Sequence, residues 1–105
     1  MEGNFGENII FMVYYMISYD IDNWEGFSQY GPAIAPLFKK YGAEVLASDT
    51  SGIVMEGEGR MMNAIVQFPS EEAALGMYYD PEYISLKKLR TDNTSKCTMV
   101  LVRGT

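Results

Sequence analysis

The sequence contains no histidine and only one cysteine, Cys97, among its 105 residues. A disulfide within the chain is therefore excluded, and the two side chains that most often bind transition metals are too few for a metal site. No second thiol or imidazole is present to activate Cys97, so we predict a small buried strand residue rather than a nucleophile. We expect a protein of a reducing compartment, with no metal and no other cofactor.

Basic residues are also scarce. Eight lysines and arginines stand against 14 acidic residues, which gives a formal net charge of −6. A broad phosphate-binding surface would have to form against this negative field, so we expect no nucleic-acid partner. Long apolar segments are missing as well, because the run over residues 9–19 is shorter than the roughly 20 residues that cross a bilayer. Glu2 and Glu7 precede it where a secretory signal would be basic. We expect a cytoplasmic protein that binds no membrane.

What is present is the composition of one folded domain. Hydrophobic residues make up 48% of the chain and charged residues 21%. A chain of this length has room for a single core. We assign residues 9–104 to one domain and residues 1–8 to a polar N-terminal extension.

The first half of the domain predicts a strand, a helix and a second strand. Residues 9–19 are apolar on both faces, which is typical of a central strand. Asp22 is a candidate cap, and apolar residues at spacings of three and four after it predict a helix that ends at Gly42. We expect a kink or restart in this helix near Pro32. Residues 43–48 predict the second strand.

The second half follows a turn. Residues 52–55 are expected to pair back as a small extra strand, and residues 60–68 alternate with the period of a strand. Two helices with caps at Ser70 and Asp80 follow, and residues 97–103 form a last strand that is apolar on both faces. This order predicts an α+β fold, the ferredoxin-like βαββαβ sandwich, with helices on one face of an antiparallel sheet.

The apolar faces of the first and last strands predict a second subunit. Helices cover only one face of such a sheet, whereas residues 9–19 and 97–103 are apolar on either face. An exposed patch of this kind favours aggregation unless something covers it. We expect an identical subunit to cover it through the sheet face, which makes a dimeric α/β barrel. The alternative is a monomer whose open face is masked by residues 1–8 or by the 49–59 loop.

A resemblance to a known family rests on residues 68–74, FPSEEAA, together with Tyr78, Tyr83 and Arg90. With these residues the chain resembles a small bacterial family of unknown function in the dimeric α/β-barrel superfamily. Antibiotic-biosynthesis monooxygenases and muconolactone isomerase belong to the same superfamily. The resemblance implies a ferredoxin-like homodimer with a ligand cavity between helices and sheet, and it implies no settled activity.

The candidate ligand-binding residues are Tyr14, Asn63, Gln67, Tyr83 and Arg90. Asn63 and Gln67 share one face of an otherwise apolar strand, where buried amides need partners, and they could line a pocket beside Tyr14 or Tyr15. Hydration near a sheet edge is the alternative for both amides. Arg90, aligned with Tyr83, is expected either to hold a substrate carboxylate or to form a structural ion pair, with Glu82 or across the dimer. The sequence identifies no catalytic residue.

Two functions remain open. The first is a homodimer that binds a small organic molecule in a cleft between sheet and helices. The second is a cofactor-independent monooxygenase or isomerase that acts on a small organic substrate. Without histidine, an enzyme would need a carboxylate or tyrosine of shifted pKa as its base, or a substrate that is itself acidic. A cavity with convergent polar groups favours ligand binding or catalysis, and a filled cleft favours a structural role.

Overall fold

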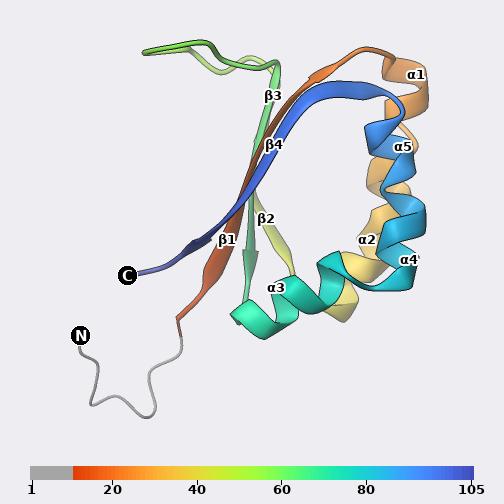
Figure 1. Cartoon of the computed structure of the whole chain (residues 1–105), viewed down its shortest axis with the longest axis vertical. Helices are drawn as coiled ribbons and strands as arrows, with labels where there is room; N and C mark the ends of the chain where they lie inside the picture. The colour runs from red at the N-terminus through yellow and green to blue at the C-terminus, as the bar shows by residue number, and fades with distance from the viewer. Residues whose placement is uncertain (1–10) are drawn as a thin grey trace.

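The helices lie on one side of a single antiparallel sheet (Figure 1). The computed structural model describes residues 11–105, so the expected N-terminal extension, residues 1–8, lies outside the described residues. The described chain forms, in order, β1 (Val13–Ile21), α1 (Trp24–Phe27), α2 (Tyr30–Lys40), β2 (Glu44–Asp49), β3 (Met62–Phe68), α3 (Glu71–Tyr78), α4 (Pro81–Leu86), α5 (Lys88–Thr91) and β4 (Thr94–Arg103).

The strand order in the sheet is β2-β3-β1-β4, and each neighbouring pair is antiparallel. β1 and β3 are therefore central, as the two apolar faces of β1 predict, and β2 and β4 are the edges. Helices connect β1 to β2 and β3 to β4. This is the βαββαβ plan of a ferredoxin-like α+β fold, so the predicted fold class is confirmed.

Local capping signals determine where the later helices begin. The Ser70 hydroxyl accepts a hydrogen bond from the Ala73 amide at 3.0 Å, and the Asp80 carboxylate accepts one from the Glu82 amide at 2.7 Å. Pro81 occupies the first turn of α4, where a missing amide donor costs nothing. Both predicted caps are confirmed.

The first helical segment is divided differently from the prediction. Asn23, and not Asp22, caps α1 by accepting a hydrogen bond from the Gly26 amide at 3.3 Å. The chain then leaves the α-helical path at residues 28–29, not at Pro32. Pro32 lies in the first turn of α2, where the amide would have had no partner within the helix. For this reason Pro32 does not interrupt α2.

The predictions can also be compared with the structure at the end of α2, in the loop between β2 and β3, and at the start of β4. Gly42, with φ of 70°, follows the last turn of α2 in the left-handed conformation that glycine favours, as expected. The extra strand over residues 52–55 is absent, because the loop between β2 and β3 forms no ladder. β4 begins at Thr94 rather than Cys97 and pairs there with Ile21, so part of the predicted polar connection is strand.

The core lies between the sheet and the helices. Val13 and Tyr15 of β1 and Val66 of β3 point to the helices, where they pack with Leu37 of α2 and Tyr83 of α4. Side chains alternate across a strand, so the residues between them point to the other face. The face that the helices leave uncovered, here called the open face, therefore carries Tyr14, Met16, Ile65, Val100 and Val102.

The open face is apolar and exposed within the described chain. Met16 of β1 is 41% exposed, and Val100 and Val102 of β4 are 50% and 41% exposed. The loop over residues 50–61 extends from the end of the sheet instead of lying along its strands (Figure 1). Its apolar residues 53–55 are exposed themselves. The predicted alternative of a monomer masked by this loop is therefore wrong, and masking by residues 1–8 falls outside the described chain.

Candidate functional site

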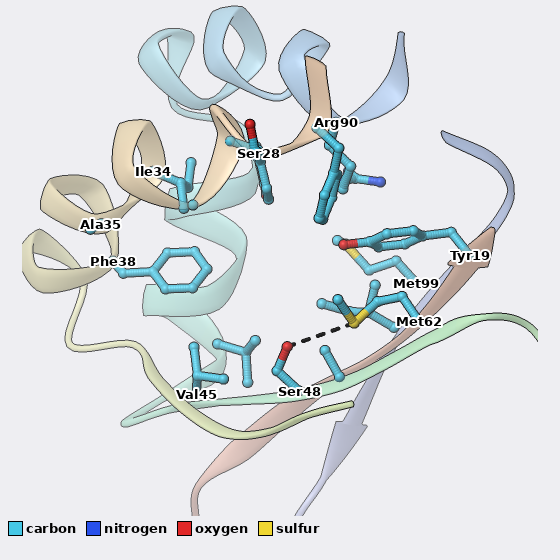
Figure 2. Close-up of a pocket in the computed structure, with 16 residues that line it drawn as sticks. Tyr19, Ser28, Ile34, Ala35, Phe38, Val45, Ser48, Met62, Arg90 and Met99 are labelled. Atoms are coloured by element: carbon cyan, nitrogen blue, oxygen red, sulfur yellow. Dashed lines mark hydrogen bonds between the residues drawn. The ribbon is translucent and has the colours of Figure 1, made fainter. Parts of the chain in front are cut away.

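A cavity of about 400 Å³ lies between the helix-facing side of the sheet and helices α2 and α5. Ile34 and Phe38 of α2 form one wall, and Tyr19 of β1 and Met62 of β3 form the opposite one (Figure 2). Residues 34 and 38 lie one helical turn apart on α2, which places both side chains on the face turned to the sheet. The wall is therefore a direct product of the apolar stripe in the sequence.

Small side chains leave this space unfilled. Gly31 and Ala35 line the cavity from α2, and Ala64 lines it from the middle of β3. A Cβ atom built on Gly31 would meet no atom within 4 Å. Gly31 and Ala35 are exposed, so the cavity is open to solvent beside α2.

Arg90 of α5 forms the polar end of the cavity, and only 4% of its surface is exposed. Its Nη2 donates a hydrogen bond to the Tyr83 hydroxyl at 3.4 Å, and its Nη1 donates one to Cys97 Sγ at 3.1 Å. The guanidinium carbon lies 5.8 Å from the ring centroids of both Tyr19 and Tyr30. Among the described residues, Nε has no hydrogen-bond partner and no carboxylate forms an ion pair with Arg90.

The two tyrosines beside Arg90 also line the cavity, and the Tyr19 hydroxyl points into it (Figure 2). Burial raises the pKa of Tyr19 to about 12, although the positive charge of Arg90 acts in the opposite direction. Burial likewise raises the pKa of Tyr30. Both phenols are therefore protonated near neutral pH and can donate hydrogen bonds to a ligand.

The structure divides the five predicted ligand-binding residues between the two faces of the sheet. Tyr83 and Arg90 meet on the helix side, although they belong to α4 and α5 rather than to one helix. Tyr14, Asn63 and Gln67 lie on the open face, where Tyr14 and Gln67 are directly paired. The sheet separates the two groups, so these five residues do not line one pocket.

Two related expectations can also be compared with the structure. Asn63 and Gln67 lie on β3, which is a central strand beside the edge strand β2, but Asn63 is exposed, as the alternative of hydrated amides expects. The Asn63 side chain donates a hydrogen bond to the Arg60 carbonyl at 3.1 Å. The ion pair expected between Arg90 and Glu82 does not form within the described chain.

Cys97 is exposed, contrary to the prediction that it is buried. Its sulfur faces the helix side, where it accepts the hydrogen bond from Arg90. β4 is an edge strand, however, so no further strand covers the thiol.

Tyr19, Met62 and Met99 were not among the predicted site residues, although all three line the cavity. The alternation of residues 60–68 placed Met62 on the apolar face, and Tyr19 shares the parity of the core residue Tyr15. The alternation of side chains along each strand was thus the available signal. It identifies residues of the cavity only once the face of the sheet that the helices cover is known.

A second hollow of about 430 Å³ lies on the open face. Met16, Ile65 and Val100 supply its apolar lining, and Asn63 and Thr98 supply polar groups. In the described residues, no three metal-binding side chains come together in either hollow or elsewhere. No helix of residues 11–105 has both the length and the apolar character needed to cross a membrane.

Comparisons with other proteins connect this geometry to a family and a fold. The family described as "Domain of unknown function (DUF1330)" matches residues 12–105. No curated protein shows significant sequence similarity to the chain.

Several solved structures have a fold similar to that of this chain. One is a protein of unknown function from Rhodopseudomonas palustris, with 17% identity and a TM-score of 0.75 over 91% of this chain and 84% of that one. Another is a dimeric ferredoxin-like protein of unknown function from Thermobifida fusca, with 8% identity and a TM-score of 0.61 over 93% and 94%. A third, from Nitrosomonas europaea, is provisionally designated an antibiotic biosynthesis monooxygenase, with 9% identity and a TM-score of 0.58 over 91% and 92%.

Proposed function

The chain belongs to the DUF1330 family of domains of unknown function, and we propose that it acts as a homodimer that binds a small, largely apolar organic molecule between α2, α5 and the sheet. The observation that carries this proposal is the cavity on the helix side. Its volume of about 400 Å³ falls in the range of small-molecule sites, which are mostly apolar with a few placed polar groups. Arg90 and the hydroxyl of Tyr19 are those polar groups here.

The shape of the cavity supports a binding role over a purely structural one. A core that serves only stability is packed without voids, because each unfilled space loses dispersion contacts and costs stability. Here Gly31, Ala35 and Ala64 leave space between two well-formed walls. A ligand of complementary shape would restore the missing contacts.

The open face supports the homodimer. Met16, Val100 and Val102 form an exposed apolar strip across the two neighbouring strands β1 and β4. A second copy of the chain offers the same strip, so a two-fold arrangement buries both at once. The dimeric neighbour from Thermobifida fusca has the same fold. Tyr14, Asn63 and Gln67 then belong to the interface side of the sheet rather than to the helix-side cavity.

The alternative function, a cofactor-independent monooxygenase or isomerase, is supported by the designation of the neighbour from Nitrosomonas europaea. General base catalysis requires a group that gives up its proton near the working pH. The raised pKa values of Tyr19 and Tyr30 make both phenols poor bases. Binding is therefore the function that the cavity supports best, and turnover would depend on the acidity of the substrate itself.

Binding of an uncharged fluorescent probe, N-phenyl-1-naphthylamine, tests the proposal directly. We expect saturable binding to the wild-type protein and a loss of roughly tenfold or more in affinity in Gly31→Leu, which adds a large side chain to the lining of the cavity. Gln29→Leu places the same side chain on an exposed position just before α2 and serves as the control. Absence of saturable binding to the wild type, or equal binding to both variants, would refute the site.

Native mass spectrometry of the protein as purified adds a second test. A retained small molecule in the wild type that is missing from Gly31→Leu would support the cavity as the binding site. A molecule retained equally by both proteins would place the binding elsewhere.

A further inference from the structure

Arg90 is a buried cation without a counter-charge in the described chain. Only 4% of its surface is exposed, and none of the ion pairs formed by residues 11–105 includes it. Arg90 lines the cavity, and its buried Nε has no hydrogen-bond partner among the described residues. Buried charges in folded proteins are normally paired, because removal from water is costly for an isolated ion.

The groups around the guanidinium are all uncharged. Tyr83 accepts a long hydrogen bond of 3.4 Å, and the rings of Tyr19 and Tyr30 lie at cation–π distance. These contacts compensate part of the lost hydration but leave one positive charge unbalanced. Arg90 is buried whereas Lys88 of the same helix is exposed, so this charge belongs to the cavity and not to the surface.

We propose that the ligand is an apolar organic acid whose carboxylate binds Arg90 while its hydrocarbon part fills the cavity beside Ile34, Phe38 and Met62. This inference rests on the proposed function, and it names the chemical class that the same site selects. A guanidinium presents paired donors that match a planar carboxylate. The Tyr19 hydroxyl, which points into the cavity, supplies a further donor from the sheet side (Figure 2).

A monocarboxylate fits better than a phosphate ester. A phosphate carries up to two negative charges and three acceptor oxygens, which proteins usually satisfy with several cations or a run of backbone amides. The cavity offers one cation, and its remaining lining is mainly aliphatic, aromatic and thioether. One positive charge at the end of an apolar space matches one negative charge at the end of an apolar molecule.

The experiment compares 4-tert-butylbenzoate with its uncharged analogue 4-tert-butylbenzamide, each as a competitor of bound N-phenyl-1-naphthylamine. We expect the wild type to prefer the acid by about tenfold or more, since charge-assisted hydrogen bonds are roughly twice as strong as neutral ones. In Arg90→Met the preference for the acid over the amide should disappear. Lys88→Gln removes an exposed positive charge from the same helix and should retain the preference.

The comparison remains decisive if Arg90→Met does not fold, because the wild-type preference requires no variant. Arg90→Lys provides a second variant that keeps the charge but loses the fork of donors, and it should retain part of the preference. Equal displacement by acid and amide in the wild type would overturn the organic-acid inference and leave the cavity proposal intact. Failure of the uncharged probe to bind would overturn the proposed function, and this inference with it.

Discussion

Tyr14 of β1 and Gln67 of β3 are directly opposed in the antiparallel ladder, on the face of the sheet that the helices leave open. They are separated from Arg90 by the thickness of the sheet. The sheet therefore has two functional sides in our proposals: the helix side binds a ligand, and the open side binds a second copy of the chain.

A charge on the open face should disrupt the dimer. Val100 pairs with Met16 at the centre of the apolar strip, and Val100→Lys would place two like charges in the interface of a two-fold dimer. We expect light scattering coupled to size exclusion to give twice the chain mass of 11.8 kDa for the wild type and a shift toward the monomer for the variant. Ile84→Lys, on the helix side with a similar exposure of 48%, is the control. A monomeric wild type would end the homodimer proposal.

The parts of the fold that could be predicted are those set by short-range chemistry. Ser70 and Asp80 cap their helices through backbone amides three and two residues away, respectively, so the signal lies within one turn of sequence. The alternation in residues 60–68 correctly separated Met62 and Phe68 from Asn63. Such patterns require no knowledge of the rest of the chain.

The parts that could not be predicted depend on which side of the sheet the helices cover. Both faces of β1 are apolar, so periodicity alone did not show that Tyr19 points to the helices and Tyr14 away from them. The candidate site was divided for this reason. The exposure of Cys97 has a similar origin, since the identity of the edge strand is decided by the sheet order and not by the composition of β4.

Two glycines should respond differently to alanine. Gly42 has φ of 70°, and an added Cβ would approach the Pro69 ring at 3.2 Å, so we expect Gly42→Ala to lower the free energy of unfolding by about 1–2 kcal/mol. Gly31 lies in the first turn of α2 with free space around it, but Pro32 follows and crowds a Cβ at this position, so Gly31→Ala should change that free energy by less than about 0.5 kcal/mol. Urea denaturation measures both values. Equal effects in the two variants would show that backbone conformation does not distinguish these positions.

Asp80 should contribute to the acid sensitivity of the fold. The Tyr41 hydroxyl, at 2.6 Å, is the main cause that lowers the pKa of Asp80 below its usual 3.8, with the Glu82 amide and Lys40 acting in the same direction. A lowered folded-state pKa gives a stabilisation that is present above the unfolded-state value and is lost as the pH falls through the folded-state value. Asn can also cap a helix but does not titrate.

We therefore expect Asp80→Asn to lower Tm at neutral pH, and Tm of this variant to fall less steeply than that of the wild type as the pH drops below 3.8. Glu82→Gln removes a neighbouring exposed carboxylate and is the control. Parallel pH profiles for Asp80→Asn and the wild type would exclude Asp80 as a source of the acid sensitivity.

Tyr15 should stabilise the fold through its hydroxyl as well as through its ring. The hydroxyl donates a buried hydrogen bond to the Ala74 carbonyl at 2.8 Å, which joins the centre of the sheet to α3. Tyr15→Phe keeps the ring, which packs edge to face on Phe68, and removes only the hydrogen bond. We expect a loss of about 1 kcal/mol in the free energy of unfolding, or about 4–8 °C in Tm for a domain of this size. Tyr79→Phe is the matched control, because Tyr79 is 68% exposed. If both variants melt at the wild-type temperature, the hydroxyl of Tyr15 adds no net stability, and the contact between β1 and α3 depends on packing alone.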